Sequence, residues 1–350
     1  MEGSKMKKML LLISLILASI VLVACGGSGE SNGDENGGST AEGEVVQIDL
    51  AHAIAESDLT PHHGYARIFK EIIEEESNGE IEVTIHPNGV LGAERDLIEG
   101  AEIGTIDAII SSTSPLGNFA DLPRVLELPY LFEDTDHFFD ALETDFGEEL
   151  NASIERDGTL KMLGWFEIGF WGYGNSVRPV THPDDLEGLT LRAVENDVKQ
   201  DWEVLVGANP TAMAFTEVFT SLQQGVIDGL GNPIPLFVAN NFQEVTTHLS
   251  ETDHFFQQGF MVMSPAFFDG LSEEHQNLVV ESAIQATEDQ REWVSDVQEQ
   301  AFQAAVDNGV EVIRREDVDI EAFRALAEEF NAQYEDEFGD ALETIKSLRE

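Results

Sequence analysis

The single cysteine of the chain, Cys25, stands where covalent modification is expected. Three lysines near the N-terminus precede an apolar run of fifteen residues, Met9 to Val23, which is too short for a membrane-spanning helix and typical of a signal peptide. The run ends in Leu-Val-Ala-Cys, which looks like a bacterial lipobox, where the cysteine is acylated on sulfur and becomes the first mature residue. A lone cysteine in an exported protein has no internal disulfide partner, and lipidation gives it a role. The alternative is a generic signal peptide with an incidental cysteine.

Three histidines near the start of the mature chain, His52, His62 and His63, are the next candidates for chemistry. Their spacing matches no specific metal-ligand pattern, and histidines at a helix start are commonly solvated or hydrogen-bonded, so we expect no metal. His52 and Glu56 fall on the first predicted strand-to-helix loop and are better candidates for polar contacts at the mouth of a cleft. Motifs for a nucleophile elbow, a phosphate loop, a dinucleotide fold or a zinc protease are missing from the sequence, so we predict neither an enzyme nor a cofactor.

The elements that must position these residues alternate between strands and helices. Apolar residues at helical spacing predict a helix over His63–Ser77, and alternating apolar residues predict a strand over Ile81–Ile85. Such alternation indicates an α/β fold with a mostly parallel sheet. Leu271–Asn308 predicts one helix of nearly forty residues, long enough to span two lobes. The other predicted strands are Val45–Ala53, Ile106–Ile110, Leu160–Phe166, Leu189–Ala193 and Ile227–Leu230, and the other predicted helices are Ala93–Ile103, Val198–Leu205, Thr216–Gln224 and Ile320–Leu348.

One internal echo suggests that the two lobes are built alike. Gly104–Asp107 and Gly225–Asp228 each follow an amphipathic helix and begin a short strand, at an offset of 121 residues. The same offset pairs Ser111 with Asn232, both just past the ends of their predicted strands. Ligands of open α/β sheets bind beyond the carboxyl ends of strands, so Ser111 and Asn232 are expected to face each other across a cleft. The alternative is a chance match of four residues.

The net charge of the chain indicates the environment of the protein rather than its mechanism. Asp and Glu number 68 against 18 Lys and Arg, a formal net charge of −50, which disfavours nucleic acid and anionic lipid surfaces as partners. Hydrophobic residues still make up 42% of the chain, so the charge does not indicate disorder. A solvated acidic surface suited to high salt, typical of a halophilic protein, is our interpretation.

Several stretches carry a resemblance to a known family. The chain is similar, over nearly all of residues 45–340, to extracytoplasmic solute-binding proteins of tripartite ATP-independent periplasmic (TRAP) transporters, of the dicarboxylate-binding DctP type. The order and spacing of the stretches together make the resemblance specific. It implies two α/β lobes joined by crossing strands, with a central cleft and one long helix spanning both. The stretches are Leu128–Phe132, Arg178–Val180, Pro183–Arg192, Gly207–Pro210, Glu217–Gly229 and Asn232–Pro233.

The resemblance implies roles for individual residues. Arg192 matches the family arginine that holds the ligand carboxylate, a task suited to a planar guanidinium that donates two parallel hydrogen bonds. Asn232 matches the asparagine that hydrogen-bonds the solute, although asparagine before a proline also favours a turn. Phe215 matches a position that is often apolar in the cleft, and core packing is its alternative role.

One departure from the family pattern bears on the ligand. Many members carry a second arginine in a Gly-x-Arg stretch, and here Gly169–Tyr173 places Trp171 there, or Gly172 if the alignment slips by one residue. A second carboxylate on the ligand would therefore lack a cation to bind it. We predict a monocarboxylate with an apolar, aromatic or cationic remainder. Tyr173 is expected beside Trp171 in the cleft, with core packing as the alternative for both.

The sequence thus predicts a lipid-anchored, extracytoplasmic binding protein that passes a small organic acid to TRAP membrane subunits. The predicted limits are 1–24 for the signal peptide, 25–44 for a flexible tether, 45–168 with about 258–297 for lobe I, and 169–257 with about 298–350 for lobe II. The alternatives are a lipid-anchored α/β hydrolase and a protein that presents a ligand to a membrane receptor.

Overall fold

The computed structural model describes residues 45–349. The predicted signal peptide, the predicted tether and the lipidation site at Cys25 lie outside the described residues. None of the helices between residues 45 and 349 combines the length and the hydrophobicity that crossing a bilayer requires.

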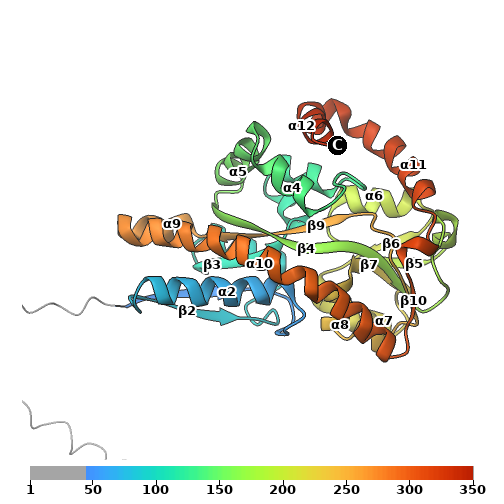
Figure 1. Ribbon diagram of the computed structural model, residues 1–350, viewed down its shortest axis with the longest axis horizontal. Coiled ribbons are helices and arrows are strands. Elements are labelled where there is room, and N and C mark those ends of the chain that lie inside the picture. The colour runs from blue at the N-terminus through green and yellow to red at the C-terminus, as the bar shows by residue number, and fades with distance from the viewer. Residues whose placement is uncertain (1–44, 350) are drawn as a thin grey trace, which may run out of the picture. The chain divides into compact units, whose positions relative to one another are not determined.

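The strands of residues 45–349 form one continuous mixed sheet in the order β2-β1-β3-β9-β4-β7-β5-β6, with β8 paired to β4 and β10 to β8 (Figure 1). The first half of β4 pairs with β9, and its second half pairs with β7 and β8, so this one strand runs through both halves of the molecule. We call β1, β2, β3 and β9 the strands of the first lobe, and β5, β6, β7, β8 and β10 those of the second. The bounds are β1 Val46–Ala51, β2 Ile81–His86, β3 Ala108–Ser112, β4 Lys161–Asn175, β5 Thr190–Ala193, β6 Asn209–Ala212, β7 Gly229–Pro233, β8 His248–Ser250, β9 Phe256–Met263 and β10 Glu311–Ile313.

The two lobes repeat one arrangement, as the internal echo predicts. Strands β2-β1-β3 and β6-β5-β7 are each parallel and each continue into a long antiparallel strand, β9 or β4. Even one side-chain contact repeats: Asp107 Oδ2 accepts from the backbone N–H of Asp49 at 2.9 Å, and Asp228 Oδ2 accepts from that of Thr190 at 2.8 Å. The parallel sheet that the alternation predicts therefore holds for the outer strands, whereas the centre is antiparallel.

Strand β4 is longer than predicted, because it continues past Phe166 to Asn175. Glycines interrupt the apolar alternation in this stretch, so the pattern that predicts a strand is missing there. Gly172 is required by close approach, since a Cβ there would lie 2.5 Å from the carbonyl oxygen of Ser250 on the paired strand β8. The stretch that carries Trp171 and Tyr173 is thus a rigid central strand.

The long helix α10 bridges the two lobes. Its 35 residues, Glu273–Asp307, pack against α2 of the first lobe, then β4, then α8 and β10 of the second (Figure 1). This confirms the predicted fold class with its long connecting helix. The predicted C-terminal helix is instead two helices, because Phe330 of α11 packs on Trp202 while α12 turns to contact α4. The remaining helices are α2 Pro61–Glu76, α3 Glu94–Glu102, α4 Thr135–Leu142, α5 Asp145–Asp157, α6 Asp197–Leu205, α7 Val218–Gln223, α8 Ile234–Ala239, α9 Pro265–Gly270, α11 Ile320–Asn331 and α12 Glu335–Ser347.

Candidate ligand-binding cavity

A narrow cavity of about 20 Å³ lies where the carboxyl ends of β3, β5 and β7 meet the middle of β4. This is the place where open α/β sheets bind ligands, although the cavity as it stands has room for little more than one water molecule. Residues from both lobes line it, so a molecule held there would touch both. The polar side chains of the lining, apart from the indole of Trp171, are those of His62, Glu94, Ser112, Ser114, Arg192, Asn232 and Gln257.

Arg192 supplies the positive charge of the cavity lining. Its side chain leaves β5, is 4% exposed, and lies with its guanidinium 5.6 Å from the ring centroid of Phe215. The Nε atom donates to the backbone oxygen of Met213 at 3.3 Å, and within residues 45–349 the guanidinium forms no ion pair. Burial lowers the pKa of Arg192 to about 10, against the opposing effect of Glu94 and Glu195, so it stays charged at neutral pH. A buried cation without a paired anion is costly, and an anionic ligand removes that cost.

Asn232 and Phe215 border the cavity beside Arg192. Asn232, on β7, is 3% exposed, and its Nδ2 reaches only the oxygen of the adjacent Pro233, at 3.5 Å. Its amide is therefore free to bond a ligand through both the donor and the acceptor. Phe215 is half-buried and packs edge-on against Phe242, so it serves the core as well as the wall.

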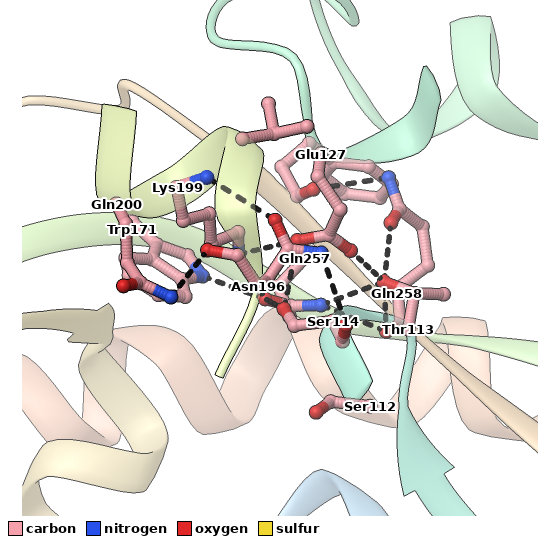
Figure 2. Close-up of polar contacts among 12 residues, drawn as sticks. Ser112, Thr113, Ser114, Glu127, Trp171, Asn196, Lys199, Gln200, Gln257 and Gln258 are labelled. Atoms are coloured by element: carbon pink, nitrogen blue, oxygen red, sulfur yellow. Dashed lines mark hydrogen bonds and ion pairs between the residues drawn. The ribbon is translucent and has the colours of Figure 1, made fainter. Parts of the chain in front are cut away.

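Trp171 also lines the cavity, but one face of its ring is occupied. The ammonium of Lys199, on α6, lies 3.7 Å from the indole centroid, and the indole Nε1 donates to Oε1 of Gln257 at 3.1 Å (Figure 2). Lys199 also donates to Gln257 Oε1 at 2.7 Å and pairs with Glu127 at 2.9 Å. Burial lowers the pKa of Lys199 to about 8, against the opposing effect of Glu127. Sequence reasoning missed this second buried cation, which lies against the ring of Trp171.

The ion pair of Lys199 belongs to a polar layer behind the cavity, drawn in Figure 2. Glu127 accepts hydrogen bonds from Thr113 Oγ1 at 2.5 Å and Ser114 Oγ at 2.7 Å, and Asn196 Nδ2 donates to the backbone oxygen of Ser114 at 3.0 Å. Thr113 and Ser114 directly follow β3, whereas Asn196 and Lys199 follow β5. The layer therefore ties the first lobe to the second immediately beside the cavity.

Glu94 faces Arg192 from the first lobe at the start of α3. It is 8% exposed, and its Oε1 accepts from Ser111 Oγ at 3.0 Å and from both the backbone N–H and Oγ of Ser112 at 2.8 Å. Ser111 was expected to face Asn232 directly, but it points to Glu94, and its neighbour Ser112 lines the cavity.

Three other predicted residues lie away from the cavity lining. Tyr173 is fully buried, stacks on His254 with ring centroids 4.2 Å apart, and donates to Glu203 at 3.2 Å. His52 is fully buried, and its Nε2 lies 3.2 Å from Nδ1 of His63. Glu56 is exposed in the loop after β1.

His62 is the histidine that the structure brings to the cavity. It is fully buried at the start of α2, edge-on to Phe166 with ring centroids 5.4 Å apart, and neither ring nitrogen has a hydrogen-bond partner within the described residues. Burial lowers its pKa well below the usual range, so the ring is neutral. Residues 45–349 contain no group of three or more His, Cys, Asp or Glu side chains placed to hold a metal ion.

The chain matches known proteins over almost its whole described length. Residues 51–337 match the family model DctP, bacterial extracellular solute-binding protein, family 7. A relative in Escherichia coli K12, the 2,3-diketo-L-gulonate-binding periplasmic protein, is 33% identical over 84% of this chain and 89% of its own length.

Solved structures share the fold. A TRAP periplasmic solute-binding protein from Polaromonas sp. JS666, bound to D-erythronate, superposes with a TM-score of 0.81 at 32% identity over 87% of this chain and 98% of that one. A second TRAP periplasmic solute-binding protein, from Bordetella and with density assigned to pantoate, superposes with a TM-score of 0.81 at 32% identity over 87% of this chain and 99% of that one. A less similar one from Sulfurospirillum deleyianum, bound to succinate, superposes with a TM-score of 0.80 at 25% identity over 87% of this chain and 99% of that one. The chain belongs to bacterial extracellular solute-binding protein family 7, the family of TRAP periplasmic solute-binding proteins that bind small acids outside the cytoplasm.

Proposed function

We propose that this protein captures a small monocarboxylate, with Arg192 as the clamp for the carboxylate and Asn232 as a second hydrogen-bonding partner. The observation that carries the proposal is the buried guanidinium of Arg192, which borders the cavity and forms no ion pair within the described residues. A carboxylate would accept two parallel hydrogen bonds there in a site of low dielectric constant, where both are strong.

A second carboxylate finds no comparable partner in the cavity. Lys199, the nearest other buried cation, is already paired with Glu127 at 2.9 Å. Arg95 pairs with the exposed Glu99, and Arg178 donates to the backbone oxygen of Asp185 at 2.6 Å, so neither serves the cavity. The negative charge of Glu94 in the lining further disfavours a dianion. The D-erythronate and pantoate of two similar structures are monocarboxylates, although succinate occupies the more distant one.

Binding would favour a closed arrangement of the two lobes. A ligand that contacts Arg192 on the second lobe and the first-lobe side of the cavity gains affinity only where both are in reach, so it shifts the population toward closure. The closed protein would then deliver its acid to the membrane subunits of a TRAP transporter, as the family membership implies. A lipid anchor at Cys25 would keep it at the outer face of the cell membrane.

A ligand screen tests this function. The mature protein is screened by thermal shift against small organic acids in high salt, and the hits are measured by calorimetry with Arg192→Ala and, as the matched control, Arg95→Ala. Arg192→Ala should lose the shift without losing stability, because it removes an unpaired buried charge, whereas Arg95→Ala should bind normally. Equal binding by Arg192→Ala would refute the clamp, a preference for dicarboxylates would refute the ligand class, and product formation would refute a pure binding role.

A further inference from the structure

We propose that a second binding site, separate from the cavity between the lobes, takes a small zwitterionic amino acid. The site is a pocket of about 140 Å³ between α11, the end of α12 and the loop 128–134 (Figure 1). A single water molecule needs about 10–15 Å³, so the pocket has room for one small organic molecule. No described residue lines both this pocket and the cavity that contains Arg192.

Positive side chains gather at this pocket in a chain that has few of them. The chain has only 18 Lys and Arg against 68 Asp and Glu, yet Arg324, Lys346 and Arg349 all line the pocket. Arg349 is engaged, because it lies 3.9 Å from Glu133 and donates to two backbone oxygens at 2.9 Å. Arg324 and Lys346 have no ion-pair partner within residues 45–349, and the buried Nε of Arg324 has no acceptor there. These two cations are therefore available to a carboxylate.

Asn331 brings a buried acceptor that lacks a donor. Its side chain is 8% exposed and lines the pocket from the same face of α11 as Arg324 and Glu328. Its Nδ2 donates to the backbone oxygen of Pro129 at 2.9 Å, which fixes the amide with Oδ1 as the unbonded end. Among the described residues no group donates to Oδ1. Buried polar atoms are nearly always paired, so a ligand or a water is expected to donate to this atom.

Two carboxylates and an aromatic ring make the pocket suitable for an ammonium group. Glu133 of the loop and Glu328 of α11 line it, together with the ring of Tyr130. Tyr130 has a φ of 50°, a left-handed conformation that is costly for a residue other than glycine. Its N–H and its hydroxyl both donate to backbone oxygens, at 2.9 Å and 2.6 Å, so the surrounding structure enforces this conformation. A ring fixed beside two carboxylates is a favourable neighbour for an ammonium group.

An amino acid matches these groups better than a molecule with one charge. Its carboxylate would accept from Arg324 and Lys346, while its ammonium group would donate to Asn331 Oδ1. A simple carboxylate would leave Oδ1 without a donor and would be repelled by Glu133 and Glu328. A simple amine would be repelled by Arg324 and Lys346. Glycine betaine has both charges but no ammonium hydrogen to donate, so it would also leave Oδ1 unpaired.

Calorimetry on the mature protein with Arg192→Ala tests the site, because this substitution removes the carboxylate clamp of the cavity. The probes are glycine, L-alanine, L-serine and L-proline. Each is compared with its amide and with the acid that lacks the amino group, such as L-alaninamide and propanoate for L-alanine, and glycine is also compared with glycine betaine. We expect at least one amino acid to bind, and to bind about tenfold or more tightly than each of its analogues, because every analogue leaves a charged or buried group unpaired.

Further substitutions locate the binding. Arg324→Gln and Asn331→Leu should each weaken the amino acid about tenfold or more, whereas Arg67→Gln, the matched control at an exposed arginine of α2, should not. Unliganded Arg324→Gln should melt no lower than Arg67→Gln, which separates recognition from folding.

Three results would overturn the proposal. Equal binding of an amino acid by Arg324→Gln would place the binding elsewhere and refute the site. Equal binding of the acid that lacks the amino group would refute the zwitterionic class, and no binding by any of the four amino acids would refute both. Each of these results leaves the proposed function standing, because that function is measured with organic acids at Arg192.

Discussion

Replacing Lys199 with methionine tests the polar layer behind the cavity most sharply. Lys199 and Glu127 have side chains that are 3% and 1% exposed, with Nζ and Oε2 2.9 Å apart. Methionine keeps most of the stem that packs on Trp171 but removes the ammonium, so the Glu127 carboxylate stays buried with only hydroxyl donors. Breaking a buried pair in this way costs about 3–5 kcal/mol of unfolding free energy.

The double variant Lys199→Met with Glu127→Gln shows where this cost arises. A neutral glutamine carries no unpaired charge, and its Oε1 can accept from the hydroxyl of Thr113 or Ser114 while its Nε2 donates to the hydroxyl oxygen of the other. We therefore expect the double variant to recover most of the loss, to within about 1–2 kcal/mol of wild type. The second substitution would then stabilise the protein that the first destabilised, which only a charge effect explains.

Urea unfolding followed by circular dichroism measures all three proteins. The matched control is Lys161→Met, because Lys161 pairs with Glu155 at 2.6 Å but the two side chains are 32% and 42% exposed. An exposed pair of this kind contributes at most about 1 kcal/mol. If Lys199→Met costs no more unfolding free energy than Lys161→Met, or if adding Glu127→Gln deepens the loss, the buried charge of Glu127 is not the cause of the destabilisation.

Three further predictions concern pH, salt and the cavity wall. Burial raises the pKa of Glu203 to about 8, so the folded protein keeps a proton that the unfolded chain releases near pH 4.5, and stability from this group is lost as pH rises between those values. Glu203→Gln, which still accepts from Tyr173, should therefore gain on wild type by at most about 1.4 kcal/mol per pH unit from pH 5 to 8 in urea titrations, and a constant difference would contradict the shift. The melting temperature should rise by several degrees from 0.1 to 2 M NaCl, because salt screens the repulsion within a net charge of −50, and a fall would contradict this explanation. Gly231→Ala should destabilise by about 1–3 kcal/mol and weaken acid binding, because a Cβ there would lie 2.8 Å from Cε3 of Trp171; unchanged tryptophan fluorescence and affinity would show that the ring had not moved.

The fold was largely predictable from periodicity and from the echo between the lobes. The strands that contain Ile109 and Leu230 begin and end at the same 121-residue offset as the echo, and the long helix begins and ends within two residues of its predicted limits. The central antiparallel strands were harder to predict, because the glycines of β4 leave no alternating pattern. The limits of the two lobes remain a prediction.

The cavity was predictable only in part. Arg192, Asn232, Trp171 and Phe215 lie in its lining, where the family resemblance and the rule of strand ends placed them. No pattern marks Glu94, since one acidic residue among 68 looks like any other until its burial is known.

Burial also explains why Lys199 and His62 could not be identified from the sequence. Lys199 sits in a helix where a lysine reads as solvated, and only the packing of Trp171 and Phe255 around it shows otherwise. His62 and the half-buried His63 are adjacent in sequence, yet only His62 lines the cavity.

A crystal structure with the tightest-binding acid of the screen tests the central claim most directly. We predict the carboxylate within hydrogen-bond distance of the Arg192 guanidinium and of the Asn232 amide. An acid whose carboxylate lies on the His62 side of the cavity, or outside the cavity altogether, would contradict it.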